Sequence, residues 1–119
     1  MEIFVIGEYL NQSVNLFCYL ILKKTFFFSI LLITDTHLIV LREIQERKGA
    51  AHVIVKRPLT SVIKITSRRK HSDLITFKYG TTEYNDTVIS DMDKFLIPNA
   101  SEATKLITQQ ILKQLETSD

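Results

Sequence analysis

The chain has 119 residues, of which 45% are hydrophobic and 24% are charged, and its formal net charge is +2. This length and composition predict one soluble globular domain with its own core. The chain is too short to divide into two domains. The only cysteine, Cys18, excludes an internal disulfide framework and offers no spacing for a zinc site, which fits a reducing compartment.

Most of the chain predicts short β-strands. The first fifteen residues predict either a short helix or an extended lead-in around residues 7–11. Apolar and β-branched runs bounded by turn residues then predict strands over 16–22, 28–34, 37–43, 51–57, 60–67 and 73–80. A polar, acidic loop is expected over 81–90, followed by a last short strand over 95–97.

The N-terminal third is unusually apolar. Two such runs, 16–22 and 26–33, flank the segment Lys23-Lys24-Thr25. Together they approach the length of a membrane span, but two central lysines would cost about 5–7 kcal/mol on insertion scales. No basic leading region or small-residue cleavage site near position 25 supports a signal peptide. We therefore interpret the runs as two buried strands joined by a basic turn.

The clearest helix is predicted over 99–116. Asn99 is a good N-cap, and Glu102 lies three residues later, where a capping box places an acid. Apolar residues recur at helical spacing at Ala103, Leu106, Ile107, Ile111 and Leu115, while Lys105, Gln109, Lys113 and Glu116 are expected in solvent. Six or seven antiparallel strands followed by such a helix predict a mainly β domain, a bent β-sandwich or half-open barrel capped by the helix. This is the pleckstrin-homology superfold.

The near-neutral total charge conceals a polarised chain. Residues 42–78 contain ten Lys/Arg against three Asp/Glu, and the residues on either side carry net negative charge. The densest cluster is Arg68-Arg69-Lys70-His71, which falls on the expected hairpin turn between strands 60–67 and 73–80. A basic tip on a rigid hairpin presents several cations to one anionic surface without first ordering a flexible tail.

Catalysis and nucleic-acid binding are not expected. The three histidines His37, His52 and His71 have no carboxylate at an informative spacing, the three glycines form no phosphate loop, and Cys18 lies within an apolar run. Aromatic residues are not interleaved with the basic turn, so the stacking platforms typical of nucleic-acid binding are not evident. No metal ligands or cofactor are expected.

A long collinear stretch resembles a known family, the C-terminal pleckstrin-homology-like domain of the TBC domain family member twenty-three trafficking adaptors. The resemblance runs from residue 31 to residue 115, over more than two thirds of the chain. The segments that carry it are LITDTH (32–37), LREI (41–44), RKG (47–49), SVIKITSRRKH (61–71), LITFKYG (74–80), LIPNA (96–100), ATK (103–105) and QQI (109–111).

The resemblance implies a non-catalytic adaptor module, and a chain that is a fragment or a shortened relative of a larger protein. In that family the full-length protein lies at the trans-Golgi network and captures endosome-derived vesicles. This chain is therefore expected to be a monomer that is peripheral to the cytoplasmic face of the trans-Golgi network and of those vesicles. One surface is said to bind phosphatidylinositol 4-phosphate, and the opposite surface an acidic segment of the tail-bearing subunit of the WASH complex. Residues 1–28 depart from the family pattern, through divergence or through translated intron sequence.

The first functional hypothesis is a membrane-docking turn. The family's basic triplet corresponds to Arg68, Arg69 and Lys70, followed by His71. Arginine forks match phosphate oxygens and lysine supplies a point charge, so these residues suit a phosphoinositide headgroup. The alternatives are a charged tip that is merely solvated, and a purely protein-binding domain without lipid affinity.

The second hypothesis is a surface for an acidic peptide. Alternation along the strands predicts that Val62, Lys64 and Lys78 share an outer sheet face, with Lys56, Arg57 and Arg42 extending it. A mixed apolar and cationic strip of this kind suits an acidic, partly apolar segment. The alternative is a set of ordinary solvent-exposed lysines.

Overall fold

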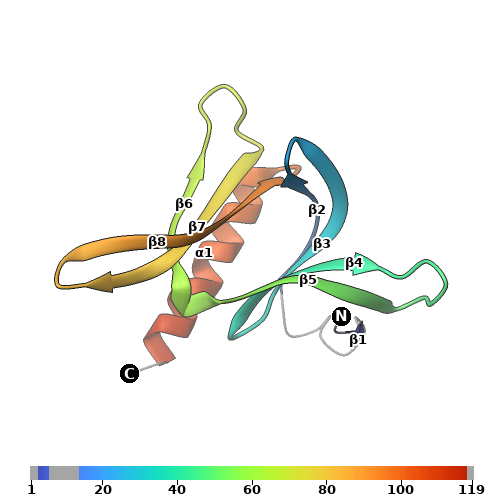
Figure 1. Cartoon of the computed structure of the whole chain (residues 1–119), viewed down its shortest axis with the longest axis horizontal. Coiled ribbons are helices and arrows are strands. Elements are labelled where there is room, and N and C mark those ends of the chain that lie inside the picture. The colour runs from blue at the N-terminus through green and yellow to red at the C-terminus, as the bar shows by residue number, and fades with distance from the viewer. Residues whose placement is uncertain (1–2, 6–13, 118–119) are drawn as a thin grey trace.

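The computed structural model describes residues 3–5 and 14–117, and the expected lead-in around residues 7–11 lies outside them. The described residues form strands, a 3₁₀ turn and a helix in the order β1 (Ile3–Val5), β2 (Val14–Leu22), β3 (Thr25–Ile33), β4 (His37–Glu43), β5 (Ala50–Pro58), η2 (Leu59–Ser61), β6 (Val62–Ser67), β7 (Leu74–Glu83), β8 (Asp86–Leu96) and α1 (Ala100–Thr117). The prediction of a mainly β domain with one C-terminal helix is confirmed (Figure 1).

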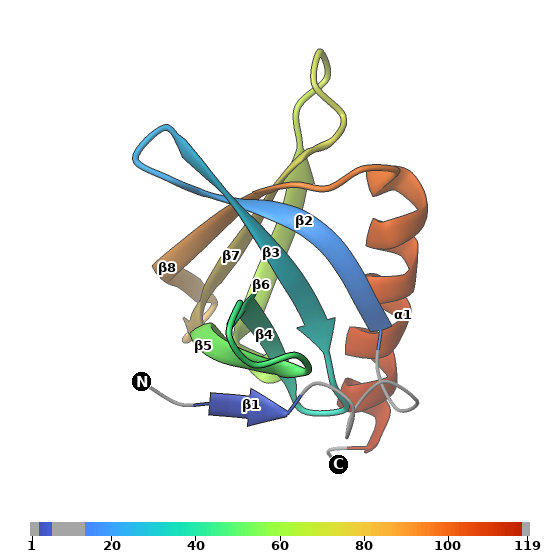
Figure 2. The same ribbon diagram turned by 90° about the vertical axis from the view of Figure 1, so that its right-hand side faces the viewer.

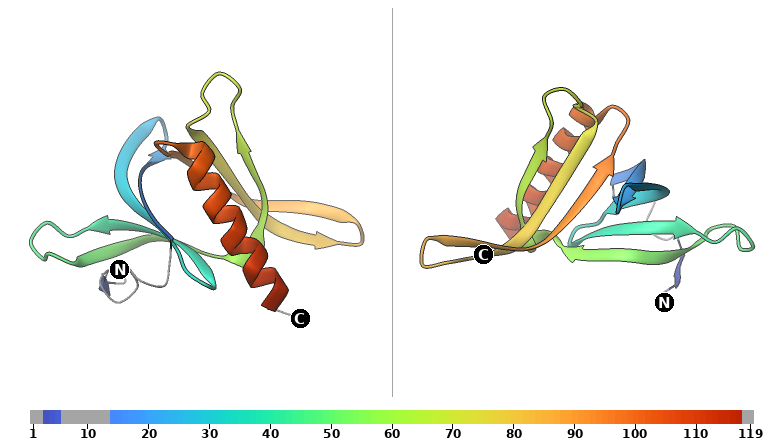
Figure 3. Two further views of the ribbon diagram at one scale, coloured as in Figure 1. Left: turned by 180° about the vertical axis from the view of Figure 1, so that it is seen from behind. Right: turned by 45° about the horizontal axis from the view of Figure 1, so that its top comes forward.

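The strands form one bent antiparallel sheet in the order β1-β5-β4-β3-β2-β8-β7-β6. Strand β2 joins its two halves, because it pairs with β3 along its length and with β8 through residues 19–21. Consecutive strands β5 and β6 are not neighbours in this order, so the sheet remains half-open. Helix α1 lies across the opening, as the view from behind in Figure 3 shows. The assignment to the pleckstrin-homology superfold stays a prediction.

The main core lies between the two halves of the sheet and the helix. Its buried side chains come from every layer: Cys18, Leu20, Leu31, Ile33, Leu38, Val40, Leu59, Ile75, Phe77, Tyr79, Phe95, Ile97, Ala100, Ala103, Ile107 and Ile111. Helix α1 begins at Ala100, immediately after Asn99, as predicted. One helix position was predicted wrongly, since Leu106 is exposed while Ala103 and Ile107 take the buried stripe.

A second, smaller cluster lies on the other face of β3, β4 and β5. It consists of Leu32, Ile39, Leu41 and Ala51, with Ile30 and Val53 packed against it. Because the second half of β3, residues 30–33, and residues 38–41 of β4 are buried on both faces, their sequences are continuous apolar runs rather than alternating ones. This explains the apolar character of the end of the N-terminal third without a membrane span. The interpretation of both N-terminal runs as buried strands is wrong for Phe17, Phe26 and Phe28, which are exposed. Within the described residues, no helix combines the length and apolar character that crossing a membrane requires.

The acidic loop predicted over 81–90 is wrong. Strand β7 continues to Glu83 and β8 begins at Asp86, so these residues form a long hairpin with a two-residue turn at Tyr84-Asn85. The hairpin projects from the body of the sheet (Figure 1), and residues 81–92 are exposed. Because neither face of this hairpin is buried, its sequence carries no apolar alternation and reads as a loop.

Candidate functional site

The basic turn, residues 68–71, lies at the end of the β6–β7 hairpin with all four side chains exposed. Two backbone hydrogen bonds hold its shape: the N–H of His71 donates to the carbonyl of Arg68 (3.2 Å), and the N–H of Leu74 donates to the carbonyl of His71 (3.0 Å). The loop is therefore a pair of linked turns that presents its cations on an ordered backbone.

No carboxylate neutralises these cations within the described part of the chain. The two ion pairs found there both belong to Arg57, which lies on β5. Arg68, Arg69 and Lys70 are therefore available to an external anion, at no cost of breaking an internal pair.

A second basic tip lies at the same end of the molecule. Lys23 and Lys24 form the two-residue turn of the β2–β3 hairpin, with φ angles of 48° and 68°, and both are exposed. Pairing of β2 with β8, which in turn pairs with β7, places both hairpins at the same end of the molecule, where their tips project separately in Figure 2. A surface hollow of about 420 Å³ lies between Phe26 of the β2–β3 hairpin and the basic turn; Phe26, Lys70, His71, Ser72, Asp73, Leu74 and Leu96 line it.

The sequence identified Lys23-Lys24 only as a turn, not as part of a site. The missing step was the pairing of β2 with β8, a contact between residues more than seventy positions apart in the sequence. The cationic end of the molecule, which we define as Lys23, Lys24, Arg68, Arg69 and Lys70, therefore combines two hairpins.

The outer face of β6, β7 and β8 carries a row of lysines. Lys64 lies directly opposite Lys78, and Lys94 lies opposite Thr76, one step along β8. Met92 lies opposite Lys78 and is exposed. Like charges directly opposite each other in a sheet destabilise it, so the lysine row, Lys64, Lys78 and Lys94, suits an anionic partner. Lys94 was missed because the sequence reading placed it outside any strand.

Val62 does not belong to this face. A β-bulge between Val62 and Lys64 shifts the alternation, so Val62 lies opposite Tyr79 and packs against the main core. The prediction that Val62 and Lys64 share one face is therefore wrong. Strict alternation fails here because one inserted residue, Ile63, turns the following side chains over.

Arg57 is engaged within the molecule. Its Nε and Nη2 atoms donate to the carboxylate of buried Asp93 at 3.2 and 3.3 Å, and Nη1 lies 3.6 Å from Asp91. The guanidinium lies over the ring of Tyr79, 4.9 Å from its centroid. The hydrogen bond to Asp93 raises the pKa of Arg57 above its ordinary value. Arg57 therefore ties β5 to β8 across the open side of the sheet and does not extend the lysine row.

The two other predicted extensions lie apart from the lysine row. Arg42 is half-buried on β4, with its guanidinium 4.5 Å from the ring centroid of Phe27 on the neighbouring strand. Lys56 is exposed on β5, opposite Ile39, in the other half of the sheet. The structure thus brings together Lys64 and Lys78, but not Arg42, Lys56 or Arg57.

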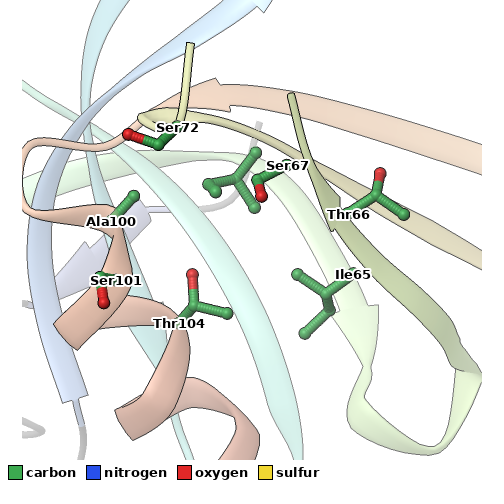
Figure 4. A pocket seen from close by; sticks show the side chains of 8 residues that line it. Ile65, Thr66, Ser67, Ser72, Ala100, Ser101 and Thr104 are labelled. Atoms are coloured by element: carbon green, nitrogen blue, oxygen red, sulfur yellow. The ribbon is translucent and has the colours of Figure 1, made fainter. Parts of the chain in front are cut away.

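A hollow of about 280 Å³ lies between β6 and the start of α1 (Figure 4). Hydroxyl and small apolar side chains line it: Ile65, Thr66, Ser67, Ser72, Ile75, Ala100, Ser101 and Thr104. None of these side chains titrates near neutral pH, so the hollow offers neither a general acid nor a general base.

The buried thiol of Cys18 and the buried phenol of Tyr79 are chemically inert. Burial raises the pKa of the Cys18 thiol to about 12 and raises the pKa of Tyr79 above its ordinary value. At neutral pH both groups are protonated and enclosed, which leaves Cys18 without the thiolate that nucleophilic chemistry needs. Among the described residues, no group of His, Cys, Asp and Glu side chains could hold a metal ion.

Comparison with known families confirms the resemblance. A family model described as TBC1 domain family member 23 C-terminal matches residues 12–118. The match takes in the Leu- and Phe-rich segment 14–28, which forms β2 and the start of β3 in regular register. Since the match covers nearly the whole chain, including strands β2 to β8 and helix α1, the chain belongs to the TBC1 domain family member 23 C-terminal family.

Proposed function

We propose that this chain is a non-catalytic adaptor module of endosome-to-Golgi vesicle trafficking that binds phosphoinositide membranes through its cationic end. The observation that carries the proposal is that two exposed hairpin tips lie at the same end of the molecule and that their five Lys/Arg have no internal ion pair in the described residues. His71 adjoins them in the same turn and is also exposed.

The strength of such binding follows from simple electrostatics. Each basic group near an anionic leaflet contributes about 1 kcal/mol, and the contribution falls off within a Debye length. Five groups give reversible, salt-sensitive docking, which suits an adaptor that must release its vesicle. Arg68 and Arg69 add fork-like donors that match a phosphomonoester, so phosphatidylinositol 4-phosphate is the proposed headgroup.

The proposed location is the cytoplasmic face of the trans-Golgi network and of endosome-derived vesicles. Membership of the family supports a role in trafficking, and the cationic end supports a peripheral association with the membrane. A domain that only binds proteins, without lipid affinity, is the alternative to this proposal.

A second activity is favoured by the lysine row. Lys64, Lys78 and Lys94, with exposed Met92 among them, form a mixed cationic and apolar surface on the outer sheet face. We propose that it binds an acidic, partly apolar peptide, such as the acidic segment of the tail-bearing WASH subunit.

The test is co-sedimentation with phosphatidylcholine vesicles containing phosphatidylinositol 4-phosphate, at low and high salt. The triple variant Arg68→Glu/Arg69→Glu/Lys70→Glu is expected to lose pelleting, and the wild type to lose much of it at high salt. The matched control, Lys64→Glu/Lys78→Glu, reverses charges outside the cationic end and should pellet normally. Equal pelleting of wild type and triple variant contradicts the lipid proposal.

The same variants separate the two activities. A fluorescently labelled acidic peptide should bind the triple variant normally and the Lys64→Glu/Lys78→Glu variant poorly. Loss of both activities from either variant would mean one shared basic surface, and the two-surface proposal would then fail.

A further inference from the structure

The β2–β3 hairpin exposes four aromatic side chains on one face. Phe17 is 67% exposed, Tyr19 36%, Phe26 54% and Phe28 57%. Phe17 stacks on Phe28 with ring centroids 5.6 Å apart, and Tyr19 meets Phe28 edge-on at 5.5 Å. We call these four residues the aromatic face.

The register of the hairpin places them together. Tyr19 lies opposite Phe28, and Ile21 lies opposite Phe26, one rung nearer the tip. The intervening residues Cys18 and Leu20 are fully buried in the main core. The inner face of the hairpin is therefore packed against the main core, and the aromatic side chains on its outer face take no part in that packing. Contiguous exposed apolar surface on a folded domain marks a contact with a partner or a membrane.

The aromatic face is continuous with the cationic end. Phe26 lines the same hollow as Lys70 and His71, and the hairpin ends in Lys23-Lys24. Residues 9–34, which include the whole hairpin, contain no aspartate or glutamate. Asp73 is the one acid that lines this hollow. Aromatic rings beside an excess of cations match the two layers of an anionic membrane surface: phosphates outside and acyl chains beneath.

A second copy of the chain fits this surface less well. A symmetric contact in which the two hairpins point the same way would bring the Lys23-Lys24 tips of both copies together. Like charges repel at close range, and burial would also remove them from water. An anionic bilayer instead accepts the rings and pairs with the cations at once.

We propose that the aromatic face inserts into the interfacial layer of an anionic bilayer, while Lys23, Lys24 and the basic turn bind phosphates above it. This inference rests on the proposed membrane function and adds an apolar component to it. The tip of this hairpin projects from the body of the domain in Figure 2, as does the tip of the β6–β7 hairpin that carries the basic turn. Because apolar burial is not screened by salt, part of the affinity survives at high ionic strength.

The absence of tryptophan from the chain makes insertion directly measurable. Phe26→Trp and Phe28→Trp each introduce a single reporter on the aromatic face. Tyr84→Trp places the control reporter on the β7–β8 tip, where the side chain is also exposed. Each protein is mixed with vesicles of phosphatidylcholine and phosphatidylinositol 4-phosphate, with and without phosphatidylcholine brominated along its acyl chains. Thermal unfolding of each variant establishes that it folds.

Both reporters on the aromatic face are expected to shift to shorter wavelength and to be quenched by the brominated lipid, while the reporter at position 84 is unchanged. Pelleting without quenching at positions 26 and 28 overturns insertion but leaves headgroup binding intact. Absence of pelleting overturns the proposed membrane function itself. A blue-shifted reporter before vesicles are added, together with a dimer in sedimentation, would assign the face to a second copy and overturn the inference.

A salt series supplies an independent measure. The Phe26→Ser/Phe28→Ser variant is expected to lose about tenfold in vesicle affinity, with the loss persisting at high salt. Val88→Ser/Ile89→Ser removes comparable exposed apolar residues from the β7–β8 hairpin and should bind like the wild type. An affinity loss for Phe26→Ser/Phe28→Ser that disappears at high salt contradicts an apolar contribution.

Discussion

The β2–β3 and β7–β8 hairpins end in the same backbone turn but carry opposite chemistry. Both turns place two successive non-glycine residues at positive φ: 48° and 68° at Lys23-Lys24, and 51° and 68° at Tyr84-Asn85. This is the turn whose twist matches that of two paired strands. The first tip is basic with aromatic neighbours, whereas the second is flanked by Glu83 and Asp86. Backbone twist thus decides the shape of a tip, and its side chains decide what it binds.

The bases of the two hairpins differ as well. The β2–β3 pairing is regular from end to end and is anchored by fully buried Cys18, Leu20 and Leu31. The β7–β8 pairing is broken by a bulge at Tyr79/Gly80, and polar contacts with Arg57 hold its base. Both bases are packed into the main core, where the β7–β8 hairpin contributes Phe77, Tyr79 and Phe95, but only the base of the β7–β8 hairpin adds ion pairs with Arg57.

Gly80→Ala should break the β7–β8 hairpin alone and have the largest effect. A Cβ at Gly80 would overlap the backbone carbonyl oxygen of Val88, and neither backbone can move without disturbing the bulge. We expect a loss of about 3 kcal/mol in the free energy of unfolding, measured by denaturant titration. Gly49→Ala is the control: it has φ +83° but open space around it, and should cost about 1 kcal/mol. Equal costs would contradict the overlap.

Arg57→Met should loosen the base of the same hairpin. Methionine retains an apolar stem near Tyr79 but leaves the buried carboxylate of Asp93 without its cation. Because Arg57 is itself partly exposed, we expect a loss of about 2 kcal/mol rather than that of a fully buried pair. Lys56→Met, at the exposed neighbouring position, should change stability by less than about 0.5 kcal/mol. A double-mutant cycle with Asp93→Asn should show strong coupling, and additive losses would rule out the pair.

Lys23→Gln/Lys24→Gln should separate the tips by charge. Two fewer cations at about 1 kcal/mol each predict a weakening of vesicle binding by about thirtyfold at low salt. The matched variant at the other tip, Glu83→Gln/Asp86→Asn, should leave binding unchanged or slightly stronger. Similar losses at both tips would mean that binding depends on net charge and not on the cationic end.

Lys24→Gly tests how much the positive φ angle of the β2–β3 turn costs in stability, and we expect its effect to be the smallest of the four. Glycine adopts φ near +68° without the steric cost that lysine incurs, so we expect a gain of about 0.5–1 kcal/mol in stability. Asn85→Gly should gain less than half of this, because asparagine already tolerates the left-handed region. Thermal unfolding measures both. A loss of stability at position 24 would show that the lysine side chain holds the turn.

The fold was largely predictable from the sequence, because burial leaves a pattern. The helix over 99–116 and the strand over 37–43 match α1 and β4, since both bury one or two regular faces. The β7–β8 hairpin escaped prediction because its outer part buries nothing, and its stability comes from backbone pairing that any polar sequence can make.

The candidate site was predictable where its residues are adjacent in the sequence or lie on two strands joined by one short turn, as Lys64 and Lys78 do. The basic turn is visible as four consecutive residues. The placement of Lys23 and Lys24 at the same end of the molecule depends on the pairing of β2 with β8. Arg57 is removed from the lysine row by its hydrogen bonds to Asp93, which lies 36 residues away in the sequence. The face on which Val62 lies depends on a bulge, which no alternation rule reveals.

That bulge also bears on how the domain behaves at high concentration. Strand β6 is a terminal strand of the sheet, with β7 as its neighbour in the sheet order, so its other edge offers backbone groups to any passing strand. The edge of β6 is irregular and carries the exposed Lys64, and the strand is followed by the cations of the basic turn. Such an edge is a poor template for edge-to-edge polymerisation. Self-association of concentrated protein is therefore expected to begin at the exposed aromatic side chains of the β2–β3 hairpin and not at the sheet edge. Detergent should reverse this self-association, whereas salt should not.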